Sequence, residues 1–195
     1  LLVLPEQYRL RDDVVAAIRA FVRGGGALLA TGASARSGIG DVLGVAFEGV
    51  DPSGGRLDLG GCAVTAPEIF RVQPAGAEVE ARFEGTDQPA VLAHRFGAGR
   101  VVYLAADIMG RYGAASPLGR RPEKGARPPR EWIGQLLGRL LPRNPLRVVA
   151  PSWYSIYLRT RGPDRLVHVV DRSFDWKGPR PAPASGVITT DLAWP

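Results

Sequence analysis

The stretch that decides the fold is residues 1–31, LLVLPEQYRLRDDVVAAIRAFVRGGGALLAT. Leu1–Leu4 is a short apolar run closed by Pro5, which predicts a strand buried on both faces. Asp12–Val22 predicts a helix, because its apolar residues recur at the 3.6-residue period. Gly24–Gly26 then stop that helix, and Ala27–Thr31 reads as a second buried strand. Strand, helix and strand with short joins predict a βαβ unit with parallel strands.

Outward from this unit, the chain continues with a less regular stretch and a hairpin. Phe47–Phe83 is rich in Gly and Pro and predicts short strands and loops inserted into the domain. Pro89–Phe96 and Arg100–Ala106 are the arms of a predicted β-hairpin, and Gly97–Gly99 is its turn. A second amphipathic helix is predicted over about Arg130–Leu141.

The character of the sequence changes after Pro142. Four short segments read as strands and predict the start of an all-β unit: Leu146–Ala150, Trp153–Thr160, Arg165–Asp171 and Val187–Leu192. We therefore expect an α/β domain over residues 1–143 and the start of a β-sandwich over residues 144–195. The expected fold class is α/β, with a parallel sheet flanked by helices, a β-hairpin and a partial all-β unit.

Composition restricts the function classes. The 195 residues carry a net charge of +6, but the basic residues are spread along the chain, apart from a denser stretch over Arg111–Arg130. Nearly all of them are arginine, which we attribute to codon bias, and we expect no nucleic-acid partner. Whether that basic stretch meets an acidic partner stays open. No run of 18 apolar residues predicts a membrane span, and Cys62 alone cannot form an internal disulfide.

The ends predict a piece of a longer protein. Residue 1 is leucine, and the chain opens in an apolar run without a charged segment before it, which is not a signal peptide. The last residues, Ile188–Pro195, read as a strand that stops within an element. We expect a fragment, and the missing signal peptide and disulfides favour a cytoplasmic location over an exported one.

Four segments carry a resemblance to a known family. They are Leu2–Pro5, Phe21–Gly26, Leu28–Gly32 and Phe96–Leu104, with the sequences LVLP, FVRGGG, LLATG and FGAGRVVYL. With these segments, residues 1–141 resemble the β-galactosidase trimerisation domain, which occurs in several glycoside hydrolases. Residues 146–195 look like the β-sandwich that often follows it.

The resemblance implies a fold and a role. The fold would be flavodoxin-like, similar to class I glutamine amidotransferases, and the family's first strand and helix would lie upstream of Leu1. The (β/α)₈ barrel that carries the paired carboxylates of glycoside hydrolysis would also precede this chain. The chain itself would then be a non-catalytic structural domain that packs beside the barrel and helps to form a homo-oligomer.

Few residues are candidates for chemistry. An amidotransferase needs a nucleophilic Cys at a sharp turn after a strand, and the turn at Thr31–Ser34 has none. Ser34 is a weak alternative nucleophile and reads more simply as a loop residue, and Cys62 lies far from this turn in sequence. His94 and His168 both alternate with apolar neighbours, as ordinary strand residues do.

Ser34 and Asp107 are weak candidates for a ligand contact. Asp107 follows the strand that ends near Ala106, and residues at the carboxyl ends of strands in open α/β sheets often line ligand crevices. Asp107 reads more simply as an ordinary helix or turn cap. We predict no catalytic residue, no cofactor and no metal site, because no set of ligands has a suitable spacing. Two alternatives stay open: an amidotransferase-like or hydrolase enzyme domain that uses Ser34 or Cys62, and a sugar-binding or partner-binding module.

Overall fold

The computed structural model describes residues 1–58, 63–107, 130–141, 146–149, 154–161, 164–171 and 187–190. The chain divides into two compact units, Leu1–Pro142 and Arg143–Pro195. The boundary between these units follows residue 142, whereas the sequence predicts it after residue 143. Among the described residues, no helix has the length and apolar character needed to cross a membrane.

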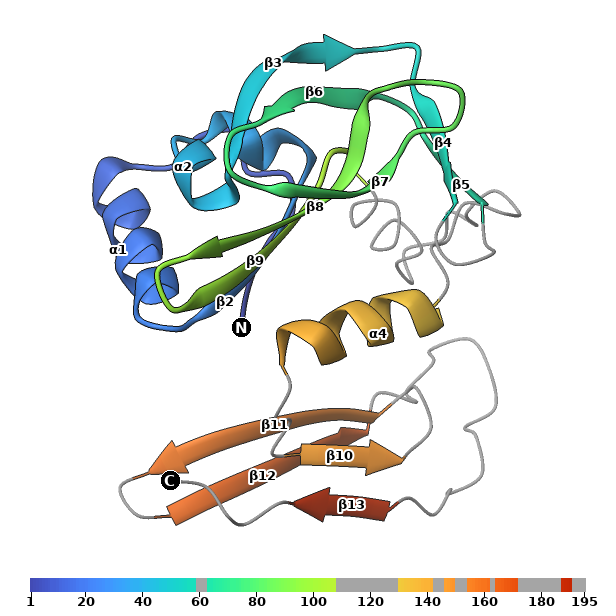
Figure 1. The fold of residues 1–195 in the computed structure, drawn as a ribbon. Helices are drawn as coiled ribbons and strands as arrows, with labels where there is room; N and C mark the ends of the chain where they lie inside the picture. Colours follow the sequence, from blue (N-terminus) through green and yellow to red (C-terminus); the bar gives the residue numbers. More distant parts are fainter. Residues whose placement is uncertain are drawn as a thin grey trace. The chain divides into compact units, whose positions relative to one another are not determined.

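The first unit begins with the predicted strand, helix and strand (Figure 1). β1 (Leu2–Leu4) pairs in parallel with β2 (Ala27–Thr31), and α1 (Asp12–Arg23) connects them. The apolar positions of α1 fall on one face, where Val15, Ile18 and Val22 are buried. The parallel pairing and the burial of these three side chains are confirmed.

The prediction that the first strand is buried on both faces is wrong. Leu4 is buried, but Val3 is 37% exposed and Leu1 is 42% exposed. β1 lies at the edge of the main sheet, so it has a strand neighbour on one side only. β2 lies inside the sheet and is buried at all five positions. The apolar run Leu1–Leu4 alone could not distinguish an edge strand from a central one.

The main sheet has the order β1-β2-β9-β8-β7 and is mixed rather than wholly parallel. β9 (Gly99–Leu104) runs parallel to β2, whereas β8 (Pro89–Phe96) and β7 (Glu78–Arg82) join as antiparallel neighbours. The predicted hairpin of β8 and β9 is confirmed, but its turn is Gly97–Ala98 rather than Gly97–Gly99, because Gly99 belongs to β9 and pairs with Phe96. The prediction of a parallel sheet holds for β1, β2 and β9 only, because a two-strand hairpin necessarily brings in an antiparallel neighbour.

The hairpin turn docks on the end of α1. The backbone amide of Ala98 donates to the carbonyl of Arg23 at 3.0 Å. A Cβ atom at Gly99 would lie 2.1 Å from the Val22 carbonyl oxygen and 2.6 Å from that of Gly26, so only glycine fits there. The two glycine-rich segments of the sequence are therefore packed against each other, which fixes the hairpin on the helix end.

Between β2 and β7 the chain leaves the main sheet and forms short elements. They are η1 (Gly32–Arg36), α2 (Gly40–Leu43), β3 (Val45–Asp51), β4 (Gly55–Asp58), β5 (Ala63–Ala66) and β6 (Ile69–Pro74). β3 pairs with β6 and β4 pairs with β5, both antiparallel. The predicted inserted strands are thus present, as two small additional sheets.

Helices lie against both faces of the main sheet. Gly99 of β9 packs on Val22, so α1 covers the face to which the odd-numbered residues of β9 belong. The opposite face includes Val102, and α4 (Arg130–Leu140) contacts β2 and β9 with Leu136 and Leu140 buried. The arrangement is compatible with the expected α/β class, although strands outnumber helices among the described elements.

The described part of the second unit consists of four strands. β10 (Leu146–Val149) pairs with β13 (Val187–Thr190), and β11 (Tyr154–Arg161) pairs with β12 (Asp164–Asp171), both antiparallel. Where they are described, the segments that the sequence predicts as strands here are strands, and the predicted turn residues Gly162 and Pro163 lie outside the described residues.

Candidate functional site

The first candidate site is the carboxyl edge, defined as the end of the main sheet at which β1, β2 and β9 finish and the segments Pro5–Gln7, Gly32–Ser34 and Ala105–Asp107 follow. Ser34 lies here and is fully buried. Its Oγ donates to the Leu4 carbonyl at 3.0 Å and accepts the Gln7 amide at 3.1 Å. The Ser34 hydroxyl therefore holds the loop after β1 onto the turn after β2.

Glu6 is the second polar residue of the carboxyl edge. Its carboxylate accepts the Thr31 hydroxyl at 3.1 Å and the Ala33 amide at 3.1 Å. The Glu6 backbone takes a φ of 50°, the only positive value at a non-glycine residue among those described. A Cβ atom at Gly32 would lie 1.9 Å from the Glu6 carboxylate, so the carboxylate fills the space over this glycine. The strained backbone places the Glu6 side chain in the position where a strand-end crevice would open.

The electrostatics of the carboxyl edge disfavour a further negative charge. Burial is the main cause that raises the pKa of Glu6, and the carboxylates of Asp107 and Glu68 add to it. The hydrogen bonds from Ala33 and Thr31 act in the opposite direction. Asp107, one of the two residues that the sequence suggests as a ligand contact, thus lies within electrostatic reach of Glu6.

The carboxyl edge is satisfied by its own groups. The hydroxyl of the buried Tyr103 donates to the Gly32 carbonyl at 2.7 Å, and burial raises its pKa above the ordinary range of tyrosine. No buried side-chain nitrogen or oxygen in the described part of the chain lacks a hydrogen-bond partner. His94 pairs with Val101 near the start of β9, at the other end of the strands from Ser34. Within the described part of the first unit, no histidine therefore lies beside Ser34 to take its proton.

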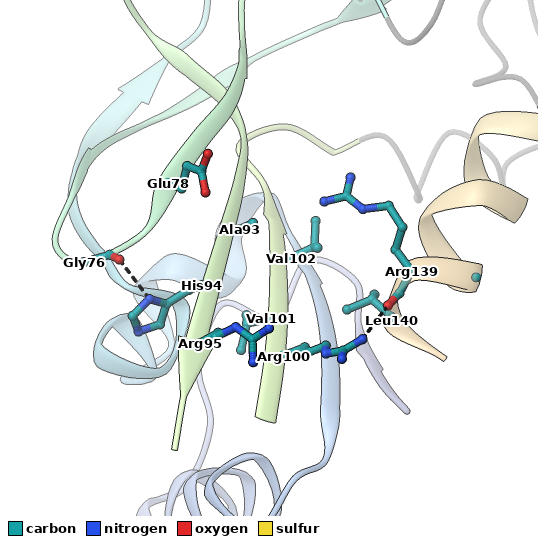
Figure 2. Close-up of a pocket in the computed structure, with 11 residues that line it drawn as sticks. Gly76, Glu78, Ala93, His94, Arg95, Arg100, Val101, Val102, Arg139 and Leu140 are labelled. Carbon is teal, nitrogen blue, oxygen red and sulfur yellow. Dashed lines mark hydrogen bonds between the residues drawn. The ribbon is translucent and has the colours of Figure 1, made fainter. Parts of the chain in front are cut away.

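The second candidate site is the hairpin pocket, a cavity of about 760 Å³ near the turn of the β8–β9 hairpin (Figure 2). β8, β9, the start of β7 and the C-terminal turn of α4 all contribute to it. Its charged and titratable lining residues are Glu78, His94, Arg95, Arg100 and Arg139. Apolar atoms come from Ala93, Val101, Val102 and Leu140. The pocket combines an apolar floor with several charged groups, as small-molecule sites do.

The three guanidinium groups of the hairpin pocket have different partners. Arg139 forms a two-contact ion pair with Glu80 of β7. Arg100 donates to the Arg139 carbonyl at 3.4 Å, as Figure 2 shows. Arg95 and Arg100 stand directly opposite each other on β8 and β9, and no described carboxylate forms an ion pair with either. Two like charges at opposed positions repel each other when nothing neutralises them.

His94 lies at the border of the hairpin pocket, on the face of β8 that points away from Arg95. Its Nδ1 lies 3.1 Å from the Gly76 carbonyl oxygen, which can only accept, so Nδ1 carries the proton (Figure 2). His94 alternates with Arg95 along β8 and therefore belongs to the opposite face of the strand. The imidazole fixes the segment before β7, and the arginines face α4.

Some of the predicted site residues lie at the carboxyl edge, and others fall outside the described residues. Ser34 and Asp107 both lie at the carboxyl edge, whereas Cys62 and nearly all of Arg111–Arg130 fall outside the described residues. Within the described ranges, no group of three or more His, Cys, Asp or Glu residues could hold a metal ion. Sequence reasoning missed Glu6, which no periodic pattern marks. It also missed the opposed pair Arg95 and Arg100, because these residues are symmetric about the two-residue turn Gly97–Ala98 and not about the predicted turn Gly97–Gly99.

The chain matches known proteins in backbone structure but not in sequence comparisons. No family model matches the chain, and no curated protein sequence matches it. Among solved structures it is similar to Gan42B, a GH42 β-galactosidase from G. stearothermophilus, with 18% identity, a TM-score of 0.61, and coverage of 87% of this chain and 26% of that one. A β-galactosidase from Bacillus circulans sp. alkalophilus aligns with 16% identity and a TM-score of 0.61, over 87% of this chain and 26% of its own length.

A third similar structure is a cold-adapted β-galactosidase from Rahnella sp. R3, at 18% identity and a TM-score of 0.61, which covers 96% of this chain and 30% of that one. This chain thus spans between a quarter and a third of the length of the β-galactosidases it matches. At such identities the match concerns the backbone, not the site residues. The chain has the fold of one region of these β-galactosidases.

Proposed function

We propose that the chain is a non-catalytic structural domain of a larger carbohydrate-active hydrolase, with a flavodoxin-like, amidotransferase-related fold and the beginning of a β-sandwich after it. The observation that carries the proposal is the closure of the carboxyl edge by Glu6 and Ser34. Domains of this architecture bind ligands in the crevice outside the carboxyl ends of the parallel strands. Here the polar groups at those ends bond to one another instead.

The second part of the proposal is association into a homo-oligomer, beside an upstream barrel of the same chain. Four large apolar side chains are exposed among the described residues: Leu1 at 42%, Val3 at 37%, Tyr8 at 58% and Phe21 at 44%. β1 also presents an edge that pairs with no described strand. Exposed apolar side chains and a free strand edge both favour contact with another surface.

The non-catalytic part is tested by activity assays on this chain. We expect no release of nitrophenol from a nitrophenyl β-galactoside and no release of ammonia from glutamine. The Ser34→Ala and Cys62→Ala variants are assayed in parallel. Turnover that either substitution abolishes would contradict the proposal and favour the alternative of an amidotransferase-like or hydrolase domain.

The oligomer is tested by light scattering coupled to size-exclusion chromatography. We expect a species larger than a monomer at micromolar concentration, and a shift toward the monomer in Val3→Lys, which places a charge on the apolar edge. Ala20→Lys is the matched control, because Ala20 is exposed on α1 and lies outside the group of exposed large apolar side chains. If the complete protein is strictly monomeric at micromolar concentration, the proposed role in oligomerisation is wrong.

A further inference from the structure

The hairpin pocket has a charge pattern that the proposed structural role does not use. One face of the β7–β8–β9 sheet carries Glu78, Ala93 and Val102 in neighbouring register, and Arg95 and Arg100 follow toward the turn. Arg139 at the end of α4 closes the opposite wall (Figure 2). The floor between these charged groups is apolar, and the volume of about 760 Å³ falls in the range of small-molecule sites.

Two guanidinium groups of the hairpin pocket form no described ion pair, and the carboxylate of Glu78 further along the same face forms none either. The charge of Arg139 is matched by Glu80, with which it forms its ion pair. Arg95 and Arg100 have no carboxylate partner among the described residues, and Arg100 bonds only to a backbone carbonyl. Their register keeps the two guanidinium groups at opposed positions on adjacent strands. An oxyanion between them would relieve the repulsion and accept hydrogen bonds from both forks.

We propose that the hairpin pocket binds a small hydroxylated anion, a sugar acid or a sugar phosphate, with its carboxylate or phosphate between Arg95 and Arg100. Glu78, at the other end of the same face, accepts hydrogen bonds from the hydroxyl groups of the ligand. The ring of the ligand lies over Ala93 and Val102. The proposal does not depend on the oligomer or on the absence of catalysis, because it uses none of the residues of the carboxyl edge or of β1.

The chemistry of the pocket favours a hydroxylated anion over a neutral sugar. A neutral sugar leaves the paired arginine charges without a counter-charge, so it gains nothing from them. A hydroxylated anion uses both ends of the pocket, because its anionic group lies between the arginines and its hydroxyl groups donate to Glu78.

The test is isothermal titration of the whole chain with glucuronate, glucose 6-phosphate, glucose and inorganic phosphate. We expect both sugar anions to bind, with either the carboxylate or the phosphate form the tighter, and glucose to show no binding. Arg95→Gln and Arg100→Gln should each weaken the sugar anion about tenfold, since each removes a charge-assisted hydrogen bond. Higher salt should weaken binding as well.

Control variants separate a specific site from general attraction. Arg9→Gln removes the same charge at an exposed position of another part of the chain and should leave the affinity unchanged. Glu78→Gln should weaken glucuronate but not inorganic phosphate, which has no sugar hydroxyl. Equal weakening by Arg9→Gln, equal binding of glucose, or inorganic phosphate that binds as tightly as the sugar anions would each overturn the proposal. Unchanged thermal unfolding of the variants shows that loss of binding is not loss of fold.

Discussion

The two ends of the same parallel strands are built in opposite ways. At the carboxyl edge, Glu6, Thr31 and Ser34 bond to one another and to neighbouring backbone groups. At the hairpin end, Arg95 and Arg100 face each other without a described carboxylate partner. Polar residues at the end of a sheet therefore do not by themselves indicate a ligand-binding site. What distinguishes a site from a structural network is hydrogen-bonding capacity left over after the protein has satisfied itself.

The largest expected effect concerns the core on which both ends rest. Ile18 is 4% exposed on the buried face of α1, so Ile18→Ala should lower the free energy of unfolding by about 2–5 kcal/mol. Denaturant titration followed by circular dichroism measures it. Phe21→Ala on the same helix serves as the control, because Phe21 is 44% exposed and should cost clearly less. An unchanged midpoint for Ile18→Ala would refute the packing of α1 on the sheet.

The next effect tests the closed carboxyl edge directly. Ser34→Ala leaves the Gln7 amide and the Leu4 carbonyl without their partner, which should lower the free energy of unfolding by about 1–3 kcal/mol. Ser53→Ala removes a hydroxyl that bonds to Asp51 at the exposed surface, and we expect a change within about 0.5 kcal/mol. If the two variants are equally stable, the bonds of Ser34 do not hold this edge together.

A smaller expected effect is the pH dependence of the free energy of unfolding that Glu6 causes at the carboxyl edge. The folded state raises the pKa of Glu6, so the folded protein holds the proton more tightly than the unfolded chain does. The contribution of Glu6 to stability is therefore complete below the ordinary value of 4.5 and is lost as the pH rises through the higher folded value. Wild type should lose stability relative to Glu6→Gln over that window, measured by denaturant titration at a series of pH values.

Asp41 provides the opposite control for this pH series. Its hydrogen-bonded ion pair with Arg19 lowers the pKa of the Asp41 carboxyl. Stability from Asp41 is present above its ordinary value of 3.8 and is lost as the pH falls through the lower folded value. Wild type should thus lose stability relative to Asp41→Asn on acidification. Slopes of the same sign for the two pairs would contradict the assigned burial of Glu6.

The smallest effect concerns the hairpin end. If Arg95 and Arg100 repel each other in the empty pocket, Arg95→Thr should raise the free energy of unfolding slightly, within the roughly 0.2–1 kcal/mol of a cross-strand pair. Arg71→Thr on β6 is the control for the loss of an exposed positive charge in a strand. A loss of stability confined to Arg95→Thr would mean that the arginine pair is structural.

Much of the fold could be predicted because local patterns decide it. The helix over Asp12–Val22 follows from its apolar period, and the glycines after it end the helix, as the structure shows. The glycines near residue 98 predicted the hairpin, although its turn is one residue shorter than expected. The exposure of Val3 could not be predicted, since it depends on the position of β1 in the sheet order. The mixed sheet has the same origin, because strand order is set by contacts between distant segments.

The sites were harder to predict for a related reason. Glu6 meets Thr31 across 25 residues, and its positive φ has no sequence signature at a glutamate. The opposition of Arg95 and Arg100 follows from the register of the hairpin, in which Phe96 pairs with Gly99 and only Gly97 and Ala98 lie between the strands. Counting outward from the predicted three-residue turn Gly97–Gly99 would have paired Arg95 with Val101 instead. The sequence therefore predicted the hairpin but not its register, and it gave no signal for the carboxyl edge.

The pairing of β2 with β9 determines how long β2 lacks one of its neighbours while the chain is synthesised on the ribosome. β2 is completely buried in the finished fold, yet the strand that covers one of its sides ends at Leu104, about 70 residues later in the chain. At bacterial and eukaryotic synthesis rates, that distance corresponds to roughly 4–15 s. For that time the edge of the apolar segment Ala27–Thr31 that β9 later covers is open, and such an edge can pair with a strand of another chain.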